Sequence, residues 1–316
     1  MEYLLLILAV VILYFGAEWL VNGASSLAAR LGVSPLIIGL TVVSFGTSAP
    51  ELLVSVEAAM QGQSALAAGN VVGSNLFNIV LILGISAIVY PLMVQKQLLK
   101  FDVPVMIGVT GLFAVLFLDG ALSRIEAFVF LLLFVVYISV LTVKSIRERR
   151  NNSEGVADMH EGIKIYPHWF IDLAMFAMGL VALVYGSGML VKNSIVIARN
   201  FGVSEAIIGL TIVAAGTSVP ELATSVVAAI KKQSDIAIGN VVGSNIFNIL
   251  LILGAAGAIR PIETPDISIK DNLFMLGISF LLLLFMAIGS KIKRWQGVVF
   301  VLFYAAYMYL KLTRMI

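Results

Sequence analysis

The chain contains no cysteine, only two histidines and few charged residues. The absence of cysteine excludes disulfides, thiolate metal sites and cysteine nucleophiles. Charged residues make up 12% of the 316 positions, against about a quarter in a soluble globular protein. Together with 60% hydrophobic residues and a mean hydropathy of +1.06, this excludes an ordinary cytosolic enzyme, a disordered tail and a nucleic-acid binder. The composition is typical of an integral membrane protein.

Long apolar runs recur along the whole chain, separated by glycine, proline or charged residues. A transmembrane helix needs about 20 apolar residues, and runs of this length without alternating polarity indicate helices rather than barrel strands. The sequence therefore predicts an all-α integral membrane protein with ten transmembrane helices. Their expected ranges are 3–22, 34–60, 66–90, 101–118, 124–143, 169–190, 204–230, 236–259, 270–289 and 296–313.

An internal repeat is the strongest single feature of the sequence. Residues 36–84 match residues 206–254 without a gap at 33 of 49 positions. One polar linker, 144–168, divides the chain into a first five-span repeat, 1–143, and a second, 169–316. Because each repeat has an odd number of spans, the two must enter the membrane in opposite senses. We therefore expect inverted repeats with a substrate site at the midplane where they meet.

The distribution of basic residues predicts the orientation. With the linker on the cytoplasmic side, thirteen of the 20 Lys and Arg residues lie inside and seven outside, as the positive-inside rule requires. We expect a multi-pass plasma-membrane protein with a cytoplasmic linker and both termini outside. Its expected surroundings are the lipid bilayer, with no nucleic acid and no obligatory protein partner.

A first polar motif, Gly46–Glu51, interrupts an apolar run and recurs as Gly216–Glu221. An ionised glutamate at membrane depth costs about 2.5 to 3.5 kcal/mol or more and is tolerated only when it faces the bundle interior with a partner. The spans contain few basic residues. The expected partner of Glu51 and Glu221 is therefore a bound cation.

Each motif also contains a proline directly before its glutamate. Pro50 and Pro220 cannot donate a backbone hydrogen bond and clash with the carbonyl four residues back, so both helices should break. Such irregular backbone is allowed at this depth only where it lines a cavity or is buried in protein. Hydroxyl groups share one helical face with the carboxylates: Ser44, Thr47 and Ser48 with Glu51, and Thr217 with Glu221.

A second polar motif, Gly69–Asn78, recurs as Gly239–Asn248. Its small-xxx-small glycines are more typical of close helix packing than of chemistry. The residues that follow add neutral oxygen ligands, because each copy places a serine and an asparagine four apart on one helical face. These pairs are Ser74 with Asn78 and Ser244 with Asn248.

Carboxylates, hydroxyls, amides and freed carbonyls together form an all-oxygen ligand set. Ca²⁺ takes 6 to 8 such ligands, and nothing here suits a soft metal. Two glutamates balance one Ca²⁺ or two Na⁺, so the set predicts exchange at a shared site and no cofactor. A Ca²⁺/H⁺ antiporter and a cation channel remain alternatives. An intramembrane hydrolase is disfavoured because no His, Cys or Lys accompanies the acids.

At these two motifs and their second copies the sequence closely resembles the cation/Ca²⁺ antiporter superfamily, specifically the prokaryotic Na⁺/Ca²⁺ exchangers. The resemblance covers the whole chain. It implies antiport of Ca²⁺ against Na⁺ by alternating access, with the first and sixth spans sliding as a gating pair. By motif position it implies the following ligands: Thr47, Ser48, Glu51, Ser74, Asn78, Thr217, Ser218, Glu221, Ser244 and Asn248, with the backbone carbonyls of Ser44 and Ala214.

One position departs from a common family pattern. Many relatives carry an aspartate in one copy where this chain has Asn78 and Asn248. The site therefore contains only two carboxylates, and the coupling ion is either Na⁺ or H⁺. The short linker has no room for a regulatory domain, so control by Ca²⁺ through a large loop is not expected.

Overall fold

The computed structural model describes residues 2–151, 163–202, 212, 214–263 and 269–313. In these ranges the regular secondary structure is helical apart from two short strand pairs, as an all-α membrane protein should be. Elements of the first half are α1 (Glu2–Leu31), α2 (Pro35–Ile38), η1 (Gly39–Val43), α3 (Ser44–Thr47), α4 (Ala49–Met60), α5 (Ser64–Leu76), η2 (Phe77–Ile82), α6 (Leu83–Val89), β1 (Leu92–Met93), η3 (Leu98–Asp102), α7 (Val103–Leu116), β2 (Ala121–Leu122) and α8 (Arg124–Asn151). Those of the second half are α10 (Trp169–Asn200), α12 (Ala214–Gly216), α13 (Val219–Ile230), α14 (Ser234–Phe247), η5 (Asn248–Leu253), α15 (Gly254–Ile259), β3 (Ile262–Glu263), α16 (Ile269–Ala287), β4 (Lys291–Ile292) and α17 (Arg294–Thr313).

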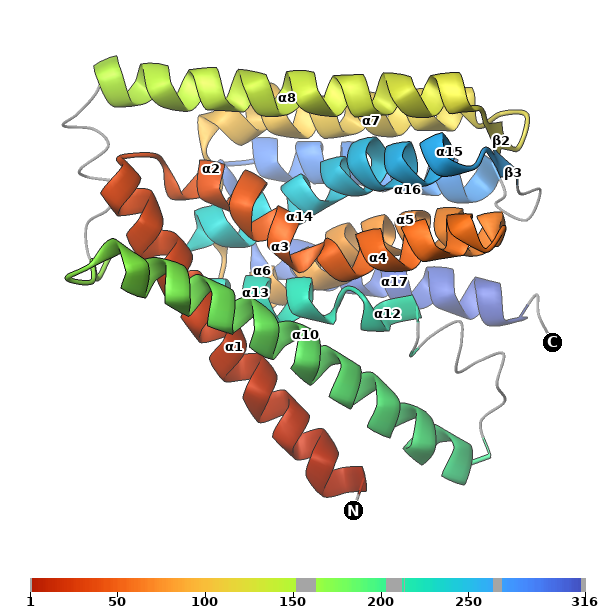
Figure 1. Cartoon of the computed structure of the whole chain (residues 1–316), viewed down its shortest axis with the longest axis horizontal. Helices are drawn as coiled ribbons and strands as arrows, with labels where there is room; N and C mark the ends of the chain where they lie inside the picture. Colours follow the sequence, from red (N-terminus) through yellow and green to blue (C-terminus); the bar gives the residue numbers. More distant parts are fainter. Residues whose placement is uncertain (1, 152–162, 203–211, 213, 264–268, 314–316) are drawn as a thin grey trace.

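The two longest helices, α1 and α10, pack against each other and run obliquely along one side of the molecule (Figure 1). Glycines permit this close approach: a Cβ atom at Gly179 would lie 2.5 Å from the backbone nitrogen of Leu20. At the linker end the buried carboxylate of Asp172 joins the two helices. It accepts 2.7 Å hydrogen bonds from Arg30 Nε and Ser26 Oγ.

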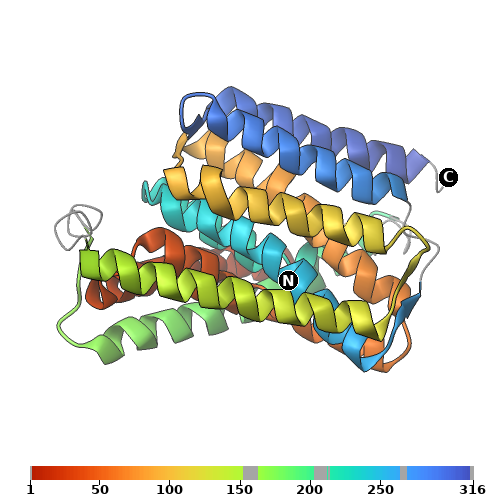
Figure 2. The same cartoon turned by 90° about the horizontal axis from the view of Figure 1, so that it is seen from above.

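The other helices form a bundle around α14, which is buried along its length. Figure 2 shows α7, α16 and α17 side by side in this bundle. Elements recur at the spacing of the internal repeat, because α4 and β1 in the first half correspond to α13 and β3 in the second. The strands pair across the halves, β1 with β4 and β2 with β3, each antiparallel.

Both proline motifs interrupt their helices, as the sequence predicts. The segment Pro35–Thr47 meets α4 at an angle of 47°, and α12 is separated from α13 by a two-residue turn. Pro50 and Pro220 lie in the first turn of the new helix, where a missing N–H costs nothing. The second motif leads into the π-helical segments η2 and η5, which are frequent at functional sites.

The structure does not confirm the expected ten spanning helices. In the described residues seven helices are long and apolar enough to cross a membrane, or eight if the bent pair counts as one span. α13 has only 12 residues, and most of the segment expected to precede it, residues 203–211 and 213, lies outside the described residues. α17 carries polar side chains at both ends, which lower its mean hydropathy. In addition, α8 runs to Asn151, so the first residues of the predicted linker are helical.

Candidate functional site

Glu51 and Glu221 are almost fully buried, with 1% and 0% of their surface exposed. Each lies in the first turn of a helix that starts after a break, where the helix dipole favours negative charge. Ser218 Oγ donates to Glu51 Oε1 at 2.9 Å, and Ser48 Oγ donates to Glu221 Oε1 at 2.9 Å. These crossed bonds bring the two breaks together at one centre.

The second oxygen of each carboxylate has no hydrogen-bond partner among the described residues. No ion pair joins either group to a described Lys or Arg; the ion pairs there are Arg30 with Asp172, Lys231 with Glu18, and Lys311 with Asp271. A buried ionised carboxylate without a partner is strongly destabilising. Glu51 and Glu221 therefore need positive charge, brought by a cation or a proton.

The two threonines point to amides of the opposite half. Thr47 Oγ1 donates to Asn240 Oδ1 at 3.0 Å, and Thr217 Oγ1 donates to Asn70 Oδ1 at 3.3 Å. Because these bonds use the hydroxyl protons, lone pairs of the threonine oxygens remain for an ion. The sequence predicts that Thr47 and Glu51 share one helical face, but the helix is interrupted between them. The hydrogen bond to Asn240 of the other half orients Thr47 instead.

The side-chain amides of Asn78 and Asn248 each donate a hydrogen bond to an asparagine of the opposite half. Asn78 Nδ2 donates to Asn245 Oδ1 at 3.2 Å, and Asn248 Nδ2 donates to Asn75 Oδ1 at 2.9 Å. The Oδ1 atoms of Asn78 and Asn248, like Ser74 Oγ, are buried and have no partner in the described part of the chain. Together with the two free carboxylate oxygens, they are the oxygen donors that a hard cation prefers.

Three predicted residues have other surroundings. Ser244 Oγ lies 3.0 Å from Ser48 Oγ, beside the Glu221 contact. Ser44 Oγ donates to the carbonyl of Gly39 at 2.6 Å, and the Ser44 carbonyl accepts from the Ser48 N–H at 2.9 Å. Ala214 begins α12, but the structure describes only its backbone.

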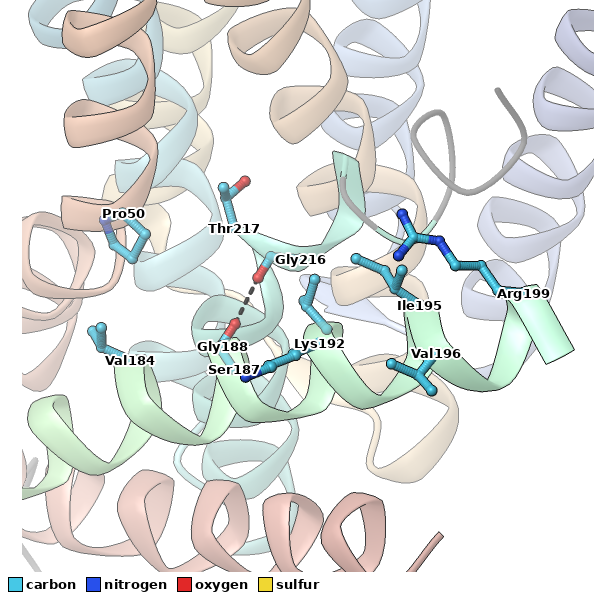
Figure 3. Close-up of a pocket in the computed structure, with 11 residues that line it drawn as sticks. Pro50, Val184, Ser187, Gly188, Lys192, Ile195, Val196, Arg199, Gly216 and Thr217 are labelled. Carbon is cyan, nitrogen blue, oxygen red and sulfur yellow. Dashed lines mark hydrogen bonds between the residues drawn. The ribbon is translucent and has the colours of Figure 1, made fainter. Parts of the chain in front are cut away.

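A cavity of about 550 Å³ reaches the site between α10 and the two helix breaks (Figure 3). Thr217, Gly216 and Pro50 lie on one side of it, and Ser187 Oγ donates to the Gly216 carbonyl at 2.6 Å. The α10 face supplies the rest of the lining: Val184, Ser187, Gly188, Val191, Lys192, Ile195, Val196 and Arg199. Thr217 is only half-buried, so this cavity is a route by which an ion can reach it.

The family model of the sodium/calcium exchanger protein matches residues 1–143 and 171–313. The chain belongs to this family. Its members are exchangers, that is, membrane transporters rather than enzymes, so this chain is a multi-pass membrane protein of the cation/Ca²⁺ antiporter type.

Two relatives of this exchanger and one solved structure are similar over nearly their full length. The putative antiporter CaxA of Alkalimonas amylolytica is 37% identical over 308 residues, 96% of each chain. The sodium/calcium exchanger MaX1 of Methanosarcina acetivorans is 36% identical over 97% of each chain. A solved structure of the sodium-calcium exchanger NCX_Mj soaked with Na⁺ and Ca²⁺ has a TM-score of 0.84 and 32% identity, and the match covers 98% of this chain and 97% of that one.

Sequence reasoning missed the residues that position the candidate ligands of this exchanger. Asn240 accepts from Thr47 and donates to Ser225 Oγ at 3.0 Å, and Asn70 donates likewise to Ser55 Oγ at 2.9 Å. Asn75 and Asn245 orient the amides of the ligand asparagines. These asparagines occupy equivalent positions in the two copies of the second motif, Asn70 with Asn240 and Asn75 with Asn245. This repetition is the signal that could have identified them.

Proposed function

We propose that the chain exchanges Ca²⁺ for Na⁺ by alternating access at the centre shared by Glu51 and Glu221. The observation that carries the proposal is the crossed pair of Ser–Glu hydrogen bonds, which leaves one buried oxygen of each carboxylate without a partner among the described residues. The names of the relatives MaX1 and NCX_Mj support Na⁺ and Ca²⁺ as the substrates.

The proposed ligands are the ones that the sequence predicts. Two carboxylates provide two negative charges, which one Ca²⁺ or two Na⁺ balance. Hydroxyl and amide oxygens complete the 6 to 8 ligands that Ca²⁺ takes in flexible geometry. The backbone carbonyls of Ser44 and Ala214 belong to the proposed set. Because both ions need the same carboxylates, occupancy by one excludes the other.

Mutual exclusion also explains why ions would move only in exchange. Without a bound ion, two uncompensated carboxylates would have to change their access across the bilayer midplane, which is costly. We therefore expect the empty site to switch sides slowly and the loaded site to switch fast, with no cofactor involved.

The proposed arrangement in the membrane is ten spans in two inverted repeats of five. Two observations support it. Elements recur at the spacing of the internal repeat, and each strand of the first half pairs with a strand of the second. The linker is cytoplasmic in this proposal and both termini are outside.

Counter-ion flux in liposomes tests the exchange. Purified protein in liposomes loaded with Na⁺ should accumulate ⁴⁵Ca²⁺ when diluted into Na⁺-free buffer at equal internal and external pH. Liposomes without a Na⁺ gradient are the control. Uptake that needs no internal Na⁺ would contradict the proposal, and passive uptake without any counter-ion would indicate a channel.

Ca²⁺/H⁺ exchange is the second candidate, because the two free carboxylate oxygens can each take a proton in place of a cation. An imposed pH gradient in Na⁺-free liposomes separates the two. Uptake driven by the pH gradient alone would mean that H⁺, not Na⁺, is the coupling ion. The proposed ligands would stay the same.

A further inference from the structure

Two side-chain contacts hold α1 against the turn between α13 and α14. Lys231 Nζ lies 2.8 Å from Glu18 Oε1, and Ser25 Oγ donates to Gln233 Oε1 at 2.7 Å. Glu18 and Ser25 lie about two turns apart on one face of α1. Lys231 and Gln233 flank Lys232, whose φ of 61° reverses the chain between the helices.

The second half of the chain lacks the residues for an equivalent contact. In the alignment of the two repeats, Gly188 of α10 stands in the place of Glu18, and Gln61 of the α4–α5 turn stands in the place of Lys231. No acidic group on α10 can therefore pair with a lysine on that turn. In the described part of the chain this ion pair therefore has no counterpart in the other half.

The position equivalent to the ion pair is open on the other side. Gly188, and Ile195 at the position equivalent to Ser25, both line the cavity that reaches Thr217 (Figure 3). A cavity of about 360 Å³ also lies between α1 and α13, but apolar side chains and Tyr14 line it and none of the candidate ligands does. In the described residues the cavity at α10 thus reaches a candidate ligand, whereas the cavity at α1 does not.

α1 and α10 pack closely against each other, so we expect them to move together. Their backbones touch at Gly179, and the 2.7 Å contacts of Asp172 with Arg30 and Ser26 bind their linker ends. A shift of the pair that closes the α10 cavity must therefore also move α1 relative to the α13–α14 turn. Glu18 and Lys231 would separate in that movement.

We propose that Glu18 and Lys231 are positioning residues of the exchanger and form a one-sided latch that favours the state with the α10 cavity open. The inference rests on the proposed exchange function. The latch sets the relative population of the two access states, because Gly188 and Gln61 cannot form a matching ion pair in the opposite state. Both side chains keep about a quarter of their surface exposed, 28% for Glu18 and 25% for Lys231. The pair is therefore weak enough to break in each cycle.

A single cysteine can report the open state, since the natural chain has none. Gly188→Cys suits this purpose, because a Cβ built there has no described atom within 4 Å apart from its chain neighbours and the backbone of its own helix. The rate at which a water-soluble maleimide modifies this cysteine in detergent-purified protein measures the open population. Glu18→Gln and Lys231→Gln should each lower the ratio of open to closed molecules about two- to fivefold and slow the reaction in proportion to the fall in the open fraction. They should raise the KM for Ca²⁺ presented on the cavity side in the same proportion.

The charge swap Glu18→Lys with Lys231→Glu should restore the labelling rate, and Lys231→Arg should keep it. Lys311→Gln is the matched control, because it breaks an ion pair of similar length, 2.7 Å, away from α1 and α10. Unchanged labelling in both single variants, or a swap slower than either, would overturn the latch. Labelling needs no transport, so that result would leave the proposed exchange standing, whereas absence of Na⁺-driven flux in the natural chain would overturn the exchange itself.

Discussion

Glu51 and Glu221 each give one carboxylate oxygen to a serine of the opposite half and keep the other without a partner in the described part of the chain. Asn78 and Asn248 show the same division: their Nδ2 atoms donate hydrogen bonds to the opposite half, and their Oδ1 atoms have no partner among the described residues. Asparagine at both positions therefore still supplies an oxygen ligand, but no third or fourth negative charge. Two carboxylates limit the positive charge that the proposed site can balance.

Glu51→Gln should abolish Ca²⁺ uptake, because it keeps the shape of the side chain and removes half of the negative charge. ⁴⁵Ca²⁺ flux in Na⁺-loaded liposomes measures this. Glu57→Gln is the control on the same helix: Glu57 is exposed and contacts only Gln61 by a hydrogen bond among the described side chains, so uptake should stay near that of the natural chain. Full transport by Glu51→Gln would remove this residue from the site.

Asn240→Ala should weaken both the fold and Ca²⁺ binding. Its amide accepts from Thr47 and donates to Ser225, and buried groups left without a partner cost about 1 to 3 kcal/mol. Thermal unfolding with and without Ca²⁺ measures both effects. The exposed Asn200 at the end of α10 provides the control, Asn200→Ala, which should change neither. An unchanged melting temperature in Asn240→Ala would mean that the amide does not hold Thr47 in place.

At the scale of helices, the breaks decide where the ligands lie. Each proline stands in the first turn of a new helix, directly before the buried glutamate. The break lets α4 and α13 direct their N-terminal ends to the centre of the bundle, and the bend of 47° measured in the first half is the result. An unbroken helix would carry its carboxylate in mid-helix, without the favourable dipole of an N-terminus.

Gly179→Ala should separate α1 from α10. A Cβ there would lie 2.5 Å from Leu20 N and 2.6 Å from the Gly16 carbonyl oxygen, and overpacking of this kind costs about 1 to 3 kcal/mol. We expect a lower melting temperature and slower exchange. Gly188→Ala is the control for the melting temperature on the same helix, since its Cβ would meet no described atom within 4 Å apart from its chain neighbours and the backbone of α10. Equal melting temperatures for the two variants would contradict close packing as the role of Gly179.

At the scale of the whole molecule, the proposed orientation places the turn before β2 outside and the linker inside. Single cysteines at Asp119 and Lys164 test it, because both residues are exposed. In intact cells a membrane-impermeant maleimide should modify Asp119→Cys but not Lys164→Cys, which should react only after permeabilisation. The reverse pattern would mean that the positive-inside count assigned the wrong side.

The sequence by itself determined the chemistry of the candidate site. Helix-breaking prolines, acids without basic neighbours and serine and asparagine at helical spacing are local properties, and each is visible within a few residues. The internal repeat also showed that the chemistry occurs twice. These features were enough to identify an all-α membrane protein and the exchanger family.

Only the tertiary structure decided which groups meet. Ser48 binds Glu221, 173 residues away, and Ser218 binds Glu51, 167 residues away, although each serine lies beside a glutamate of its own motif. Helical periodicity predicts neighbours three or four residues apart and contains no information about contacts between distant segments. The close packing of the two halves therefore set the amide orientations, and it placed Glu18 against Lys231 where the repeat has no counterpart.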